Sequence, residues 1–324
     1  MVAHHTSPIH RKCHCQINRL RETTAWHYNI GMIQSKVYFT KEAGPDVLVR
    51  MYDALGIKLP GKVAVKLHSG EKGNPNYLRP EFVKPLIEHV NGTVVECNTA
   101  YAGQRDATEK HVKLMAEHGW SKYFDVDIMD ADGEVKLDIP DGLRIKENYV
   151  GKNLLNYDSM VVMSHFKGHP MGGFGGALKQ LSIGCASSHG KLHIHCVGEE
   201  DTQPDMFKAD QIGFIESMAD AASAVAKHFS DNVVYLNAMV NLSVDCDCCG
   251  EGTNPELPCM QDIGILASTD PIAIDQACID LIWHSDDPGR DHFVERVESR
   301  HGRHILEAAE RLNFGKREYE LIEI

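Results

Sequence analysis

Short runs rich in β-branched residues alternate with amphipathic stretches between residues 32 and 159. Three stretches with helical spacing each end next to a glycine, a residue that commonly follows the last turn of a helix. Strands and helices in alternation are typical of βαβ units, which build a parallel sheet with helices on its faces. The expected strands are 36–39, 63–67, 93–97 and 160–163, and the expected helices are 45–55, 80–90 and 108–118.

The second half of the chain resumes this pattern after residues 164–197, a segment rich in glycine and histidine that we expect to be mostly loop with one short helix. Further helices are expected over 208–229, 271–283 and 292–312, and further strands over 233–240 and 263–267. The sequence therefore predicts an α/β fold. It has a mixed or mostly parallel sheet with helices on both faces, in one unit or in two lobes split near residues 150–200.

The first 31 residues differ from the rest, because they carry four lysines and arginines against a single acid and lack a sustained amphipathic period. We interpret residues 1–31 as a leader that is disordered or not native, and residues 32–324 as the folded domain.

Charge and composition exclude two classes of partner. The chain has 46 acidic and 33 basic residues and a net charge of -13, whereas nucleic-acid binding needs a cationic face. It also has no apolar run of the roughly 18 residues that a membrane span requires. Ten cysteines in 324 residues are too few for a disulfide scaffold, so we expect a reducing compartment, in which clustered cysteines bind metals or carry out redox chemistry.

Four thiols lie within one glycine- and proline-containing loop: Cys246, Cys248, Cys249 and Cys259. Thiolates are soft ligands that suit iron–sulfur clusters, zinc or copper(I), and four of them complete a tetrahedral shell. The spacing matches neither a ferredoxin run nor a pair of CxxC knuckles, so it leaves the metal open. The alternative is that some of these cysteines pack as small buried apolar residues.

The hexapeptide 164–169, which contains His165, Lys167 and His169, directly follows an expected strand. In an open α/β sheet, ligands bind at the carboxyl ends of strands. The next residues include Gly175 and Gly176 and lead into an expected helix that contains Lys179. Backbone N–H groups at such a helix start bind anions, and lysines reinforce the site, although a tight turn alone also explains the glycines.

A third group consists of His189, Lys191, His193 and His195, which alternate along the chain. If residues 190–197 are extended, all four side chains leave the same face of a strand. Imidazoles gathered there bind a metal or shuttle protons near neutral pH, and the lysine holds an anionic substrate. If the segment is an exposed loop, the histidines are solvated and inert.

Weaker signals surround these groups. Glu96, Asn98 and His68 lie at the ends of expected strands and are candidates for the same crevice. Asp270 precedes Pro271 in a pattern typical of a helix N-cap. Asp275 and Asp280 are expected on the polar face of the helix that follows.

Several separated motifs, in order along the chain, resemble proteins built on the domain of unknown function 362. They are 164–169, 175–179, 183–186, 190–191, 245–248 and 262–271, and the resemblance spans about residue 33 to the C-terminus. Members are often described as uncharacterised iron–sulfur-centre proteins of anaerobic microbes, which implies cytoplasmic localisation and a redox or metal role. This chain lacks the ferredoxin-type cysteine run of many members, so any cluster has to use the four thiols of the loop.

A shorter similarity covers residues 175–179 and the glycines and histidines after them. It is to the nickel-pincer lactate racemases, in which lysine and histidine act as metal ligands or acid/base groups. It implies nickel as an alternative metal and gives concrete roles to Lys179, His189 and His195.

Three functional hypotheses follow. The first is a redox protein whose thiol loop holds an iron–sulfur cluster beside a crevice for a small anionic ligand, with an electron-transfer partner. The second is a non-redox isomerase or lyase in which histidines act as general acid and base and lysines hold a carboxylate. The third is a binding protein in which the loop holds structural zinc. The candidate catalytic residues are His165, Lys167, His169, His193 and His195; the candidate anion-binding residues are Gly175, Gly176, Lys179 and Lys191.

Overall fold

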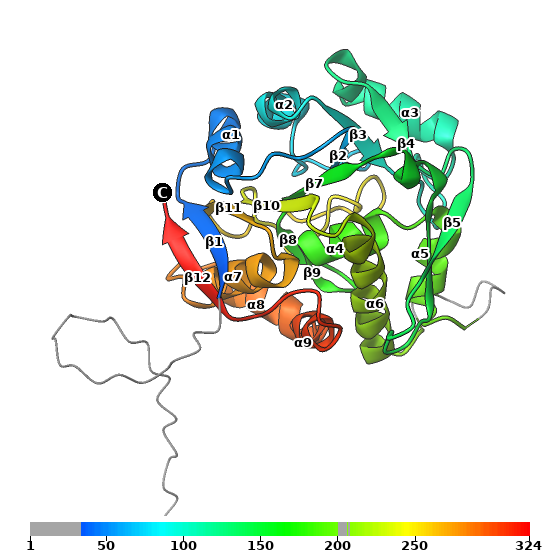
Figure 1. Ribbon diagram of the computed structural model, residues 1–324. Helices are drawn as coiled ribbons and strands as arrows, with labels where there is room; N and C mark the ends of the chain where they lie inside the picture. Colours follow the sequence, from blue (N-terminus) through cyan, green and yellow to red (C-terminus); the bar gives the residue numbers. More distant parts are fainter. Residues whose placement is uncertain (1–33, 200–205, 207) are drawn as a thin grey trace, which may run out of the picture. The chain divides into compact units, whose positions relative to one another are not determined.

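An eight-stranded sheet runs through the computed structural model, which describes residues 34–199, 206 and 208–324 (Figure 1). Its strand order is β12-β1-β11-β10-β7-β2-β3-β4. The predicted leader, residues 1–31, lies outside the described residues. The strands are β1 (Ser35–Thr40), β2 (Val63–Lys66), β3 (Gly92–Glu96), β4 (Val126–Ile128), β7 (Ser159–His165), β10 (Val233–Met239), β11 (Gly264–Ser268) and β12 (Tyr319–Glu323).

Most neighbouring strands in this sheet are parallel. Only β11 runs antiparallel to its neighbours, β10 and β1, so the sheet is mixed but mostly parallel, as predicted. Two small hairpins lie outside it, β5 (Glu134–Asp138) with β6 (Glu147–Gly151) and β8 (Lys167–His169) with β9 (Gly173–Gly175).

Helices cover both faces of the sheet, because the central strands are buried on both sides. Every residue of β7 is buried, and alternate side chains join different cores: Met160 and Val162 pack with one, Val161 and Met163 with the other. Residues of α1 and α2 belong to the second core, and residues of α6, α7 and α9 to the first. Figure 1 shows α1 and α2 on one side of the sheet and α6, α7 and α9 on the opposite side.

The helices follow the expected ones closely, apart from two differences described below. They are α1 (Pro45–Ala54), α2 (Pro80–His89), α3 (Thr108–Glu117), α4 (Ala177–Lys179), α5 (Ser188–His195), α6 (Gln211–Phe229), α7 (Pro271–Trp283), α8 (Arg290–Ser299) and α9 (His304–Arg311). Short 3₁₀-helices occur at Trp120–Lys122 and Lys152–Asn156, and a π-helix continues α4 over Gln180–Gly184. Among the described helices, none is long and apolar enough to cross a bilayer.

The single helix predicted over 292–312 is in fact two helices, α8 and α9. The chain turns between them at His301, whose φ of 52° lies in the left-handed region. Gly302 then packs tightly on the β8–β9 hairpin, where an added Cβ would lie 3.1 Å from the Cα of Gly173. The sequence did not indicate this break, because both helices bury an apolar face and the amphipathic pattern continues from one to the other.

Residues 190–197 are neither the extended segment nor the exposed loop that were the two alternatives, because residues 188–195 form helix α5. The hydroxyl of Ser187 caps this helix by accepting a hydrogen bond from the Gly190 N–H at 2.9 Å.

Helix α7 contains two aspartates that behave differently from each other. Asp270 caps its N-terminus, as predicted, by accepting from the N–H groups of Ile272 and Ala273. Asp275, expected on a polar face, is instead fully buried. It accepts from the Ala177 N–H at 2.8 Å, the Leu178 N–H at 3.0 Å and the side chain of Asn237 at 2.7 Å. This carboxylate therefore fastens the start of α4 to α7 and β10.

Replacing Asp275 by alanine tests this anchor. The variant leaves two buried N–H groups without acceptors, so we expect the free energy of unfolding to fall by about 2–4 kcal/mol. Urea unfolding followed by circular dichroism measures the change. Asp286→Ala, at an exposed position beyond the same helix, is the matched control and should change stability by less than about 0.5 kcal/mol. Equal effects of the two substitutions would contradict the role of Asp275.

Candidate functional site

A cavity of about 390 Å³ lies at the carboxyl ends of the parallel strands, where α/β sheets usually bind ligands. Lys66 ends β2 and Glu96 ends β3, and both line it. The β8–β9 hairpin after β7 contributes Lys167 and His169, and α5 contributes Lys191 and His195. The same wall contains His68, Tyr101, Arg105, Gly175, Gly176, Lys179, Gln180, Cys248 and Cys249.

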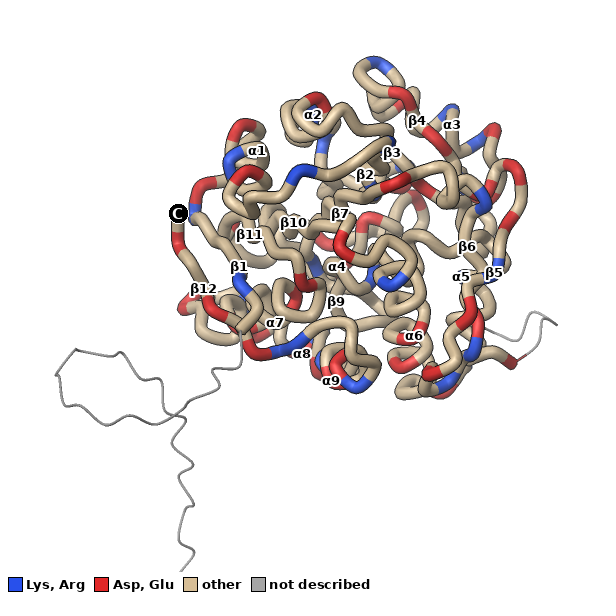
Figure 2. The backbone as a smooth tube through the Cα atoms, viewed as in Figure 1, with Lys and Arg blue, Asp and Glu red and all other residues tan. Residues whose placement is uncertain are grey.

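Positive charge dominates the wall of this cavity. Three of its cations meet a buried carboxylate: Lys66 pairs with Glu96 at 3.0 Å, Arg105 with Glu71 at 3.0 Å, and Lys167 with Asp247 at 2.8 Å. Two further cations, Lys179 and Lys191, have no carboxylate within ion-pair distance among the described residues. The cavity is therefore suited to a small anion, whereas the outer elements in Figure 2 carry acidic and basic positions interspersed.

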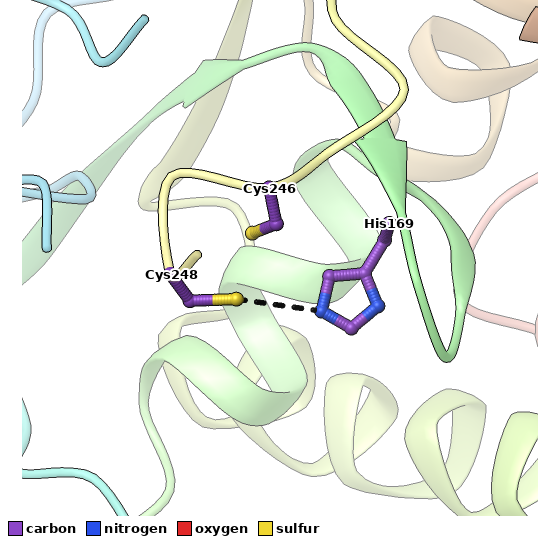
Figure 3. A group of neighbouring side chains, drawn as sticks. All are labelled: His169, Cys246 and Cys248. Carbon is purple, nitrogen blue, oxygen red and sulfur yellow. Dashed lines mark hydrogen bonds between the residues drawn. The ribbon is translucent and has the colours of Figure 1, made fainter. Parts of the chain in front are cut away.

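Three side chains beside the cavity form a group that could hold a metal ion: His169, Cys246 and Cys248. One ligand atom from each lies within 4.8 Å of the others (Figure 3). The Cys248 sulfur lies 3.8 Å from His169 Nε2, and Lys179 Nζ lies 3.8 Å from the Cys246 sulfur. Two sulfurs and one imidazole favour soft or borderline metal ions such as zinc, nickel or iron.

The two sulfurs of this group have opposite protonation tendencies. Burial opposes ionisation of Cys246, but a hydrogen bond from Cys248 and the positive charges of Lys179 and Lys167 lower its pKa well below the ordinary value. Hydrogen bonds to Cys246 and Cys249, together with burial, raise the pKa of Cys248 well above the ordinary value. Of the two sulfurs, Cys246 therefore favours the thiolate form and Cys248 the thiol form.

The other two cysteines of the loop do not join this group in the described structure. Cys249 follows a turn closed by the bond from its N–H to the Cys246 carbonyl, at 2.9 Å, and lines the cavity next to Cys248 without being part of the three-residue group. Cys259 is bound to Leu242, whose carbonyl accepts from both its N–H and its thiol, and it packs against the core. The structure thus gathers two sulfurs and an imidazole where the sequence led us to expect four sulfurs.

His169 and His195 line the same cavity but are held in opposite tautomers. The Nδ1 atom of His169 accepts from the N–H groups of Met171 and Gly172, so its Nε2 carries the proton of the neutral ring. The Nδ1 atom of His195 faces the Lys191 carbonyl at 2.6 Å and donates to it, so its Nε2 keeps a lone pair. Burial is the main reason that the pKa of each ring is lowered to about 4.

His165, a predicted catalytic residue, does not line the cavity. Its two ring nitrogens face oxygen acceptors, Asp247 at 2.8 Å and the Val240 carbonyl at 2.7 Å. Asp247 also pairs with Lys167, and these two neighbours lower its pKa far below the usual value despite the opposing effect of burial. His165 and Lys167 therefore fix the loop that presents Cys246 and Cys248.

Helix α5 divides the four alternating residues between two faces, because residues two apart point in nearly opposite directions on a helix. Lys191 and His195 line the cavity. On the other face, His189 lies 2.9 Å from Glu134 and its ring packs on Tyr149. His193 contacts Tyr149 edge-on and does not line the cavity. The alternation of these residues along the sequence therefore did not place them on one face, because the segment is a helix and not a strand.

The anion site expected from the backbone at the start of α4 is already filled. The N–H groups of Ala177 and Leu178 bind Asp275 rather than a ligand, although Gly175, Gly176 and Lys179 do line the cavity. Anion binding in this cavity therefore relies on cationic side chains and not on the start of α4.

Sequence reasoning missed Lys66, Arg105 and Gln180. Lys66 has no exposed surface and donates to Glu96, to the Leu67 carbonyl at 2.5 Å and to Gln180 at 3.1 Å. The feature of the sequence that could have revealed Lys66 is a single lysine within an otherwise apolar strand. Of the weaker signals, Glu96 and His68 line the cavity, whereas Asn98 binds Thr108 outside it.

The buried histidines predict how stability depends on pH. The pKa is lowered to about 4 for His169 and His195 and to about 3 for His111, mainly by burial. The unfolded chain then binds more protons than the folded one below about pH 6.5, so the free energy of unfolding of the metal-free protein should fall as the pH drops from about 6.5 to about 4. Asp275 acts in the opposite direction, because burial raises its pKa to about 6 and the folded protein therefore binds its proton more tightly than the unfolded chain. It is one group against three histidines.

Urea unfolding at about pH 7 and about pH 4.5 measures this dependence. His195→Gln should make it shallower, whereas replacing the exposed His284 by glutamine should leave it unchanged. A stability that is the same at both pH values would contradict the analysis.

No curated protein matches this chain. Solved structures similar to it include the lactate racemase apoprotein from Thermoanaerobacterium thermosaccharolyticum, at 16% identity and a TM-score of 0.40, over 67% of this chain and 53% of that one. Another is a protein from Thermotoga maritima, at 12% identity and a TM-score of 0.41, over 82% of this chain and 58% of that one. The chain thus spans less than two thirds of the length of either protein.

The family comparison covers more than half of the chain and agrees with the motifs found in the sequence. The family model described as "Domain of unknown function (DUF362)" matches residues 63–280, a range that holds the metal-ligand group and every residue of the cavity wall. The protein belongs to the DUF362 family.

Proposed function

We propose that this protein binds one soft metal ion through Cys246, Cys248 and His169, and that it binds a small anion in the adjoining cavity. The observation that carries the proposal is the position of the His/Cys/Cys group beside a cavity that holds two lysines for which the described residues offer no carboxylate partner. The donor set fits zinc, nickel or iron, and such an ion supplies Lewis-acid or redox chemistry.

The sulfurs are the anchoring ligands in this proposal. Cys246 favours the thiolate form that binds metals, and Lys179 and Lys167 stabilise its charge. His169 differs from most metal-binding histidines, because its Nδ1 accepts from backbone N–H groups where such histidines usually donate. Binding at Nε2 therefore requires the ring either to become an imidazolate or to move its proton to Nδ1 at the cost of these backbone bonds. Cys248 also has to lose its thiol proton to bind, so metal uptake should release protons.

An iron–sulfur cluster with a redox role is the finer form of this proposal. Cys249 lines the same cavity as Cys248 and offers a third sulfur close to the group, whereas Cys259 is engaged with Leu242. Iron together with acid-labile sulfide would establish the cluster, and an electron-transfer partner would then take the place of the small-molecule substrate.

Metal content of protein purified without oxygen tests the ligand set. We expect about one equivalent of zinc, nickel or iron in the wild-type protein, and a loss of most of it in Cys248→Ser, because removing one of three ligands weakens binding by about tenfold or more. Cys259→Ser is the matched control and should retain the metal. Equal losses in both variants would support the four-thiol loop expected from the sequence, and a metal-free wild-type protein would contradict the proposal.

A non-redox isomerase or lyase is the second candidate function. The specific observation is the pair of opposite tautomers, in which His169 presents an N–H and His195 a lone pair to one cavity. A proton donor and a proton acceptor on one bound anion are the requirements for moving a proton between its atoms. Lys179 would hold the carboxylate during this transfer.

Exchange of carbon-bound hydrogen for deuterium, followed by NMR over a panel of small carboxylic acids, tests this candidate without knowledge of the substrate. His195→Gln should slow the exchange by about 10²–10⁴-fold, because a general base is lost. His193→Gln, outside the cavity, is the control and should exchange like the wild type. Bound zinc without exchange or anion binding would favour a structural zinc loop.

A further inference from the structure

Lys191 is partnered differently from the paired lysines of the cavity. Lys66 and Lys167 each face a carboxylate, whereas the Lys191 ammonium donates to the carbonyl of Ala186 at 2.5 Å. The residue is only 8% exposed and lines the cavity. Among the described residues no carboxylate lies within ion-pair distance of it. A buried lysine of this kind lacks a direct ion pair that would stabilise its protonated form.

The surroundings of Lys191 destabilise its protonated form. Burial is the main cause that lowers its pKa, and the positive charge of Lys66 acts in the same direction. Cys97, Asp130 and Glu96 act in the opposite direction without reversing the shift. Desolvated lysines near a second cation are the lysines that react as nucleophiles with carbonyl compounds.

Two further residues complete a reactive arrangement. His195 lies one helical turn after Lys191 on the same face of α5, and its Nε2 lone pair accepts a proton because Nδ1 donates to the Lys191 carbonyl. Lys179 lines the same cavity and has no carboxylate partner in the part of the chain that the structure describes. The cavity thus combines an amine, a base and a site for a carboxylate.

We propose that Lys191 is a nucleophile that forms a Schiff base with a small 2-oxo acid, whose carboxylate binds to Lys179. The amine nitrogen bonds to the carbonyl carbon, and a proton moves from nitrogen to the carbonyl oxygen with His195 as the relay. The resulting carbinolamine loses water and leaves a C=N bond, so no oxidant or reductant is consumed. This inference rests on the anion-binding part of the proposed function and not on the metal.

Borohydride trapping with pyruvate tests the proposal on the full-length, chelator-treated protein. Hydride reduces the C=N bond to a stable secondary amine, which intact mass and peptide mapping detect. We expect one reduced pyruvyl adduct on Lys191, formed about tenfold or more faster than on exposed lysines such as Lys113. Lys191→Met should abolish it, and Lys179→Met should slow it at low pyruvate but not at saturating pyruvate. Acetone, which lacks the carboxylate, should label Lys191 more slowly than pyruvate.

Adducts spread over exposed lysines, or found on Lys179 instead, would overturn the proposal, as would an unlabelled protein. The peptide map of the wild-type protein decides this even if a variant fails to fold. Thermal unfolding separates the two levels of inference. A rise in Tm with pyruvate but no adduct would leave the anion site standing and reject the nucleophile, whereas no rise with pyruvate or with inorganic phosphate would count against the anion site itself.

Discussion

The buried carboxylate of Asp247 fixes the geometry on which the candidate site depends. It has no exposed surface, lies between two sulfur-bearing residues in the sequence, and pairs with both His165 and Lys167. Those partners come from the end of β7 and from β8, so one side chain ties the thiol loop to the edge of the sheet where the cavity opens. Breaking a buried pair of this kind typically costs about 3–5 kcal/mol, because a charge is left without compensation.

Backbone contacts support the same loop from its other side. The side-chain amide of Asn74 donates to the carbonyls of Cys246 and Cys249, at 3.1 and 2.7 Å. The Glu71 N–H donates to the Asp247 carbonyl at 2.8 Å, and Glu71 in turn pairs with Arg105 in the cavity wall. The loop after β2 and the thiol loop thus form one hydrogen-bonded unit, and the sulfurs are oriented before any ligand arrives. Preorganisation of this kind lowers the cost of binding a metal or an anion.

The sequence was sufficient for features that depend on local periodicity. Strands β1, β2, β3, β7, β10 and β11 and helix α7 occur where alternation, helical spacing and capping predicted them, because both faces of the sheet are buried. The site was harder to predict. The residues of α5 alternate in the sequence but divide between two faces of a helix, and only the Ser187 cap indicates the helix locally. The pairing of Cys246 with His169 joins residues far apart in the sequence, so loop spacing within 246–259 could not reveal it.

Glycines near the site serve close approach more than unusual backbone conformation. A Cβ on Gly168 would lie 2.3 Å from the Val244 carbonyl oxygen, and one on Gly250 would lie 2.3 Å from that of Lys72. Neither glycine has a positive φ, so space rather than strain requires them. The first brings the thiol loop against β8, which carries His169, and the second brings it against the loop after β2. The two glycines thus set how closely the loop with the two sulfurs approaches the imidazole of His169. Asp247 fixes the orientation of that loop through its two ion pairs. The metal-ligand group and the cavity wall are consequently parts of one packed unit.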